Sequence, residues 1–158
     1  MDIELPDGAL VLVDSSAIVY LVEGEEGSPR RRAVESFFVE AAARGWTVIA
    51  STLIWKELLE KPLATEQGEL ASRYRRVLSD SSRIELRVVD VAVAEEAAVL
   101  AASLASTLRR GISTADLVHV ATAITAGADA ILGNDTDWRK IPRCPPILLI
   151  DELAHSID

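Results

Sequence analysis

Short apolar runs that end at helix-capping residues recur along this sequence and constrain its fold most strongly. Leu10–Val13 is too short for a helix and contains β-branched residues, and the capping residues Asp14–Ser16 follow it directly. Thr47–Ala50 repeats the pattern and is followed by Ser51–Thr52. Each run predicts a buried strand that leads straight into a helix.

The same alternation continues along the chain. Helices are predicted over Ser16–Val22, Pro29–Arg44, a segment that carries Glu57 and ends before Pro62, Gln67–Leu78, Val93–Leu108 and Ser113–Ala126. Further strands are predicted over Ile84–Val89, Ala128–Leu132 and Ile147–Ile150, with a polar turn over Gly133–Asp137. Alternating strands and helices predict an α/β fold, a three-layer doubly wound sandwich with a central, mainly parallel sheet. The length of 158 residues, with no linker, predicts a single domain over residues 1–158.

Composition excludes several classes of protein. Cys144 is the only cysteine, and the two histidines lie far apart in sequence, so neither a disulfide framework nor a Cys/His zinc site is expected. The acidic N-terminus, which contains proline and glycine, is unlike a secretory signal, and no apolar stretch approaches the roughly 20 residues of a membrane-spanning helix. We therefore expect a cytoplasmic protein with no membrane association.

The net charge of −9 argues against broad electrostatic attraction to nucleic acid. A polyanionic substrate would have to be recruited by local basic groups, each of which is more typical of a solvated surface. These groups are Arg30–Arg32, Arg73 with Arg75–Arg76, Arg109–Arg110, and Arg139–Lys140 with Arg143.

Acidic residues follow the predicted strands or begin the helices next to them. In open parallel sheets, ligands bind beyond the carboxyl ends of the strands, so acids at these junctions can meet at one edge. The acids in question are Asp14, Glu57, Asp116, Asp135 and Asp137.

Each acid also has an ordinary structural interpretation. Asp14 can cap the following helix, and Glu57 can form an ion pair with Lys61 one helical turn later. Ser113 and Asp116 have the spacing of a capping box, and the segment from Asn134 to Asp137 resembles ordinary turn chemistry. These interpretations do not explain why all the acids fall on the expected ligand-binding edge.

Carboxylates that crowd together need cations or protonation to persist. Oxygen ligands without thiolate or a convincing imidazole indicate Mg²⁺ or Mn²⁺ rather than zinc. Two such ions roughly 4 Å apart can activate water and stabilise the leaving oxygen during phosphodiester cleavage.

Four motifs in this order resemble the PIN domain, and in particular the ribonuclease toxins of VapBC toxin-antitoxin systems. The resemblance spans nearly the whole chain, and its motifs are Val11–Ala17, Ser51–Leu59, Thr114–Ala123 and Ala128–Trp138. The resemblance implies that Asp14 and Asp116 are the principal metal ligands, that Glu57 completes the site, and that Asp135 is the fourth acid. Asp137 occupies an acid position of the same motif, so either of the last two acids can face the metal.

Neighbouring residues receive supporting roles from the same resemblance. Ser15 or Ser16 can hydrogen-bond Asp14 or a substrate phosphate, and Asn134 is expected beside the metal ligands. Gly133 departs from the family's frequent threonine, which removes a hydroxyl contact there. His119 lies one helical turn from Asp116, but a histidine on an apolar helix face is more typical of a core position.

The favoured hypothesis is a metal-dependent endoribonuclease, the toxin of a pair with a cognate protein antitoxin. The resemblance also implies a homodimer, for which the helices between Pro29 and Ser79 offer apolar surface. One alternative is a noncatalytic PIN-like module for RNA processing. Another is an Mg²⁺-dependent phosphatase with Asp14 as nucleophile, although no second aspartate follows two residues later.

Overall fold

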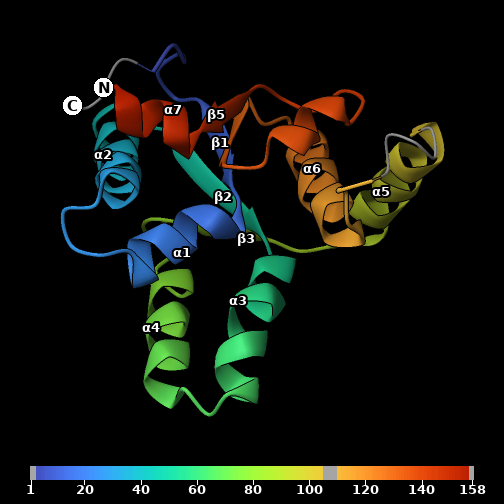
Figure 1. Ribbon diagram of the computed structural model, residues 1–158. Coiled ribbons are helices and arrows are strands. Elements are labelled where there is room, and N and C mark those ends of the chain that lie inside the picture. Colours follow the sequence, from blue (N-terminus) through green and yellow to red (C-terminus); the bar gives the residue numbers. More distant parts are fainter. Residues whose placement is uncertain (1–2, 105–109, 157–158) are drawn as a thin grey trace.

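The computed structural model describes residues 3–104 and 110–156. Five strands form one sheet in the order β3-β2-β1-β4-β5, and every neighbouring pair is parallel. Figure 1 shows the sheet with helices on both sides. The strands are β1 Leu10–Val13, β2 Thr47–Ser51, β3 Glu85–Arg87, β4 Ala130–Gly133 and β5 Ile147–Leu149. The predicted parallel sheet and α/β class are confirmed.

Helices cover both faces of this sheet. They are α1 Ser15–Glu23, α2 Pro29–Ala43, α3 Leu53–Ala64, α4 Gly68–Leu78, α5 Val91–Ser103, α6 Thr114–Ala126, the 3₁₀ helix η1 Thr136–Lys140, and α7 Ile150–His155. Val11 and Val13 of β1 lie in a core with α1 to α4 and α7, whereas Leu12 between them lies in a second core with α5 and α6. Because alternate strand residues face opposite sides, the chain forms the predicted three layers. Among the described helices, none is long and apolar enough to span a membrane.

The helix α3 continues past the point where it was predicted to end. Pro62 lies inside the helix, so the expected end before this residue is wrong. Proline cannot donate to the carbonyl one turn earlier, but Pro62 is buried, and burial of its ring offsets part of that loss. The Thr65 N–H then donates to Lys61 O at 3.0 Å, and the Gln67 N–H to Pro62 O at 2.8 Å, which satisfies the last carbonyls.

The C-terminal region also differs from the prediction. Ile150 was expected to end a strand but begins α7, a helix that the sequence reading missed. The Asp151 N–H in the first turn of α7 donates to the Asn134 Oδ1 at 3.1 Å. A side chain from a distant part of the chain thus satisfies a helix end that local sequence leaves open.

The helix α5 begins at Val91, two residues before the predicted Val93. Residues 105–108 of the predicted helix, and Arg109 after them, lie outside the described part of the chain.

Candidate active site

The candidate site lies where the strand order reverses. From β1 the chain moves to β2 and β3 on one side, and β4 and β5 then occupy the other side. A crevice beyond the carboxyl ends of the strands forms at such a switch point. Asp14 follows β1 directly and Asp135 comes two residues after β4, so these two acids flank the switch point. The Asp14 N–H donates to the Leu132 carbonyl at 2.9 Å, which extends the pairing of the two strands to the site.

Asp14 is held by the two serines that follow it. Its side chain accepts hydrogen bonds from Ser16 Oγ at 2.8 Å, from the Ser16 N–H at 3.3 Å and from Ser15 Oγ at 3.4 Å. The residue is 8% exposed and is the N-cap of α1. The capping role is therefore present and leaves the carboxylate at the crevice.

Gly133 allows β4 to approach Asp14 closely. A Cβ atom at this position would lie 3.2 Å from the Asp14 Cβ and 3.6 Å from its Oδ2. The first separation is tight, so a side chain at this position would require Asp14 to shift by a few tenths of an ångström, whereas the second is an ordinary van der Waals contact. Glycine thus leaves the Asp14 side chain free of this contact.

Asp116 lies in the first turn of α6. The Ser113 N–H donates to the Asp116 Oδ2 at 2.6 Å, and the Asp116 N–H donates to Ser113 Oγ at 3.1 Å. The capping box read from the sequence is thus formed. Because α6 precedes β4 and packs on the sheet, its first turn lies at the carboxyl edge, and the capping bond uses one oxygen of the carboxylate.

Glu57 is not paired with Lys61, the partner suggested by helical spacing. Its Oε2 instead lies 2.5 Å from the Nε2 of His119, a residue 62 positions later on α6. His119 is buried, as the sequence suggested, but it also contacts an acid of the site. Local spacing could not reveal this pair, because its partners come from different helices.

Asp135 and Asp137 occupy different surroundings. Asp135 caps η1 by accepting from the Asp137 N–H at 2.8 Å. Burial raises the pKa of Asp135, the hydrogen bond from Asp137 opposes this, and the negative charges of Asp116, Asp137 and Asp14 raise it further. The Asp137 carboxylate contacts Lys140, and a Cβ at Gly111 would lie 2.5 Å from its Oδ2. Of these two acids, Asp135 therefore carries its charge without a lysine partner.

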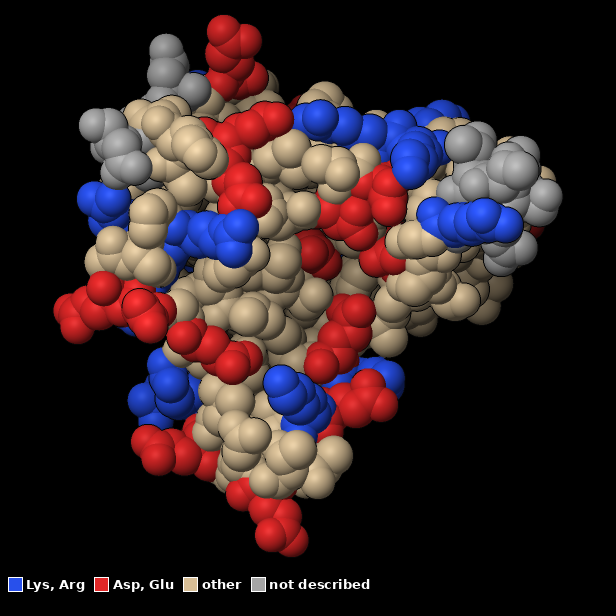
Figure 2. All heavy atoms as spheres, viewed as in Figure 1, with Lys and Arg blue, Asp and Glu red and all other residues tan. Residues whose placement is uncertain are grey.

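The pKa shifts of His119 and Asp135 both depend on the charges of other acids. Burial alone lowers the pKa of His119, but its hydrogen bond to Glu57 and the charges of Glu57, Asp14 and Asp116 outweigh it, so this pKa is raised overall. Together with Asp135, this places four acids from separate segments within one region of negative potential. Figure 2 shows Asp and Glu side chains gathered near the centre of the viewed face, with Lys and Arg along the rim above them.

The side chain of Asn134 bonds to groups outside this set of acids. Its side-chain amide donates to the Tyr20 hydroxyl at 3.4 Å, and its oxygen accepts from the Asp151 N–H at 3.1 Å. These bonds tie the end of β4 to α1 and α7. Asn134 therefore holds the end of β4 in place, and Asp135 is the next residue along the backbone.

The family model of the PIN domain matches residues 11–143. The chain belongs to the PIN domain family. None of the curated proteins matches its sequence.

Solved structures similar to this PIN domain come from complexes. VapBC2 from Rickettsia felis, bound to a DNA fragment from its promoter, has a TM-score of 0.70 at 17% identity and covers 89% of this chain and 98% of that chain. DNA-bound VapBC from Salmonella typhimurium has a TM-score of 0.67 at 16% identity, with 90% and 98% covered. VapBC-5 from Mycobacterium tuberculosis, a member of the VapBC family of toxin-antitoxin systems, has a TM-score of 0.59 at 19% identity, with 89% and 97% covered. At these identities the likeness shows the fold.

The carboxylates of this PIN domain are suited to a hard cation by their chemistry. Within residues 3–104 and 110–156, no group of three or more His, Cys, Asp or Glu side chains stands close enough to hold a metal ion as positioned. Three of the acids nevertheless keep one oxygen outside their capping or imidazole contact: Oδ1 of Asp116, Oε1 of Glu57 and Oδ2 of Asp135. Both oxygens of Asp14 accept hydrogen bonds from Ser15 and Ser16. Carboxylate oxygens of this kind are the ligands that Mg²⁺ prefers.

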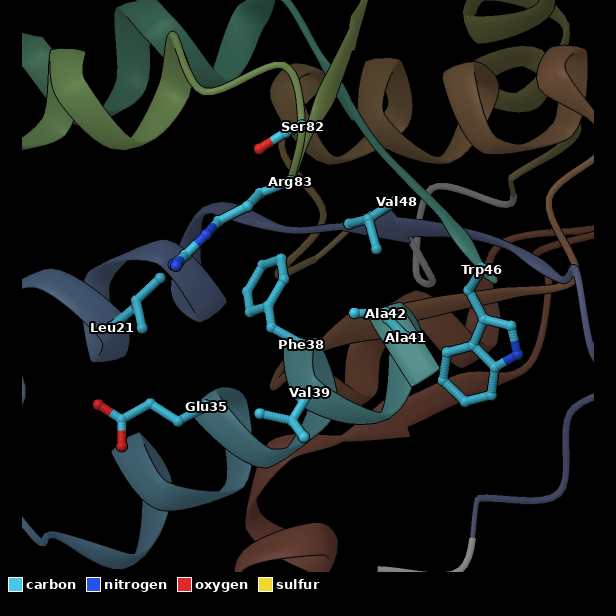
Figure 3. Close-up of a pocket in the computed structure, with 10 residues that line it drawn as sticks. All are labelled: Leu21, Glu35, Phe38, Val39, Ala41, Ala42, Trp46, Val48, Ser82 and Arg83. Atoms are coloured by element: carbon cyan, nitrogen blue, oxygen red, sulfur yellow. The ribbon is translucent and has the colours of Figure 1, made fainter. Parts of the chain in front are cut away.

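A cavity of about 420 Å³ lies elsewhere on the PIN domain. Figure 3 shows that its walls come from α1, α2, β2 and the segment between α4 and β3, with Phe38, Val39 and Trp46 among its apolar side chains. None of the five candidate acids lines it. The acid site is therefore separate from this apolar cavity.

Five of the basic residues named in the sequence pair with acids. Arg30 and Arg31 bind Asp151 and Glu35, and Arg139 and Arg143 bind Glu152 and Glu96. Lys140 differs from these arginines because its partner, Asp137, is one of the candidate acids of the site.

Proposed function

We propose that this PIN domain is a metal-dependent endoribonuclease that hydrolyses phosphodiester bonds of RNA with Mg²⁺ or Mn²⁺. The observation that carries the proposal is that the negative charges of Asp116 and Asp14, which come from separate segments, both raise the pKa of Asp135 beside the switch point of the sheet. A carboxylate surrounded by other negative charges favours binding of a divalent cation.

Each residue has a defined part in the proposed site. Asp14 and Asp116 would be the principal metal ligands, with Glu57 and Asp135 completing the set and Asp137 as a further candidate. When bound, the metal would polarise the phosphate and lower the pKa of a water molecule. Ser15 and Ser16 orient Asp14 through the hydrogen bonds described above, which fixes one ligand before any cation binds.

The biological context is proposed from the similar structures. VapBC complexes, one of them named as part of a toxin-antitoxin system, share this fold, and they support assignment of the chain as a toxin held by a cognate protein antitoxin. We further propose that residues 1–158 act as one domain, that the protein forms a homodimer, and that it works in the cytoplasm. Size-exclusion chromatography with light scattering tests the dimer.

Cleavage of a single-stranded RNA tests the catalytic proposal. Wild type is expected to cut the RNA in Mg²⁺ or Mn²⁺ and to stop when EDTA is added. Asp14→Asn and Asp116→Asn are expected to lose at least about a hundredfold in rate, because even partners of metal ligands contribute 10- to 100-fold. Glu69→Gln is the matched control, since it also removes one negative charge but lies exposed on α4. Equal cleavage by all four proteins would overturn the proposed site.

The two alternative functions give different results in the same experiment. A noncatalytic module would bind Mn²⁺ or RNA without cleaving it in any condition. A phosphatase would release inorganic phosphate from phosphate monoesters and leave internal RNA bonds intact. Either result would replace the nuclease assignment.

A further inference from the structure

His119 contacts Glu57 from inside the core. The Nε2 to Oε2 distance is 2.5 Å, and the two side chains are 1% and 25% exposed. Glu57 thus has one oxygen bound to a buried ring, while its side chain as a whole stays partly exposed. Lys61, the exposed alternative on the same helix, is not bonded to Glu57 in the described structure.

Trp138 holds the imidazole ring in turn. The two rings stack with centroids 6.1 Å apart and planes inclined by 19°. Trp138 is 2% exposed and belongs to η1, the short helix that Asp135 caps. Aromatic stacking of this kind restricts rotation of the buried imidazole about its side-chain bonds.

The contacts of His119 with Glu57 and Trp138 therefore join three segments that carry acids. Glu57 lies on α3, His119 shares α6 with Asp116, and Trp138 follows Asp135 by three residues. A carboxylate held by a rigid partner keeps its direction, whereas a free glutamate samples several rotamers.

We propose that His119, clamped by Trp138, is a positioning residue that holds the Glu57 carboxylate toward the acid site. This inference rests on the proposed function, because it assigns Glu57 to a metal-dependent site. Its content is separate, however: a histidine that merely fills the core would need only its volume, whereas a positioning histidine needs its Nε2 donor.

Two substitutions separate the effect of the side-chain volume of His119 from the effect of its Nε2 donor. His119→Leu keeps an apolar side chain of similar size but has no donor, and His119→Gln places an amide N–H near the former Nε2. His155→Leu is the matched control, because it removes the other histidine of the chain, which is exposed on α7. Mn²⁺ affinity is measured by isothermal titration calorimetry, and kcat and KM are measured with the same RNA.

The expected result is a loss confined to the leucine variant. His119→Leu should bind Mn²⁺ roughly 10- to 100-fold more weakly and lose kcat to a similar extent, with KM for RNA little changed. His119→Gln should recover most of both losses, and His155→Leu should match wild type. Circular dichroism confirms that each variant is folded.

Nuclear magnetic resonance of ¹⁵N-labelled histidine provides a readout that needs neither metal nor activity. With only two histidines, the His119 signals are assigned by comparison with His119→Gln. Glu57→Gln should shift the His119 Nε2 resonance and leave His155 unchanged. No shift would show that the contact is absent in solution and would overturn the inference.

The remaining outcomes also decide between the two proposals. If wild type cleaves RNA and folded His119→Leu binds Mn²⁺ and cleaves equally well, the positioning role is wrong and the proposed function stands. If folded His119→Gln is as impaired as His119→Leu, a restored N–H donor does not recover function, which also overturns the role. If wild type neither binds Mn²⁺ nor cleaves RNA, the proposed function itself fails, and the positioning role fails with it.

Discussion

Acidic side chains meet different partners at two places in this molecule. At the end of α2, Arg44 bonds to Asp7 at 2.8 Å, lies 3.7 Å from Glu40 and stacks over Trp46 at 4.9 Å from the ring centroid. At the carboxyl edge of the sheet, the described contacts of Asp14 and Asp116 are serine hydroxyls and backbone N–H groups. Donors of this kind orient a carboxylate without cancelling its charge, whereas a guanidinium does both.

The difference separates a structural cluster from a candidate binding site. Around Arg44, charge is neutralised and the arginine also donates to the carbonyls of Ile3 and Leu5, which anchors the N-terminal segment. At the carboxyl edge, charge is oriented but retained. A divalent cation should therefore stabilise the edge and leave the Arg44 cluster unaffected.

The largest expected effect is stabilisation by metal. At a Mg²⁺ or Mn²⁺ concentration about 100 times the dissociation constant, the free energy of unfolding of wild type should rise by about 2.7 kcal/mol. Asp14→Asn should lose this gain, whereas Arg44→Ala should keep it. Urea unfolding with and without metal measures both. An equal gain in wild type and Asp14→Asn would place the bound ion elsewhere.

A smaller effect is expected at the Arg44 cluster itself. Arg44→Ala removes hydrogen bonds to two backbone carbonyls and to Asp7, so the free energy of unfolding should fall by about 1–3 kcal/mol. RNA cleavage per folded molecule should stay at the wild-type level. Arg76→Ala on the exposed face of α4 is the control and should change stability by less than about 0.5 kcal/mol. If Arg44→Ala is equally harmless, the cluster is not structural.

The two roles of Asp14 can be separated by two substitutions measured without metal. Asp14→Ala loses the cap of α1 and should cost about 1 kcal/mol of stability. Asp14→Asn keeps a capping side chain and removes one repulsive charge, so it should be as stable as wild type or more stable. A large destabilisation by Asp14→Asn would show that the charge itself supports the fold and would weaken its assignment as a metal ligand.

The smallest effect concerns pH at the ion pair of α2 with α7. Arg30 binds Asp151 through two bonds of 2.6 and 3.1 Å, and this hydrogen bonding lowers the pKa of Asp151 below its usual value. The unfolded chain therefore binds a proton more readily, so the pair stabilises the fold at neutral pH and this contribution is lost as pH falls below about 4. Urea midpoints between pH 7 and pH 3 should fall slightly less steeply for Asp151→Asn than for wild type. Identical slopes would exclude a contribution from this carboxylate.

Much of the fold was predictable because its signals are local. The apolar runs before Asp14 and Ser51 became β1 and β2, and the capping box of Ser113 and Asp116 formed at the start of α6. Strand ends and helix caps depend on neighbouring residues, so one chain suffices to place them. The acids at these junctions followed from the same signals.

What the sequence did not reveal depends on distant partners. The start of α7 is supported by Asn134, and Pro62 is accommodated in α3 because it is buried in the core. The His119 contact of Glu57 requires two helices to pack together, and helical spacing favoured Lys61 instead. A lone buried histidine beside an acidic motif was the available signal, but its partner could be found only in three dimensions.

The strand order also bears on when the protein can become active during its synthesis. The first strand made, β1, is central, and its neighbour on one side is β4, the fourth strand along the chain. A site drawn from positions 14 and 135 cannot assemble while the ribosome still holds the later residues. Under the proposed nuclease function, a nascent chain would be unable to cleave RNA until Asp135 has left the ribosome and β4 has paired with β1.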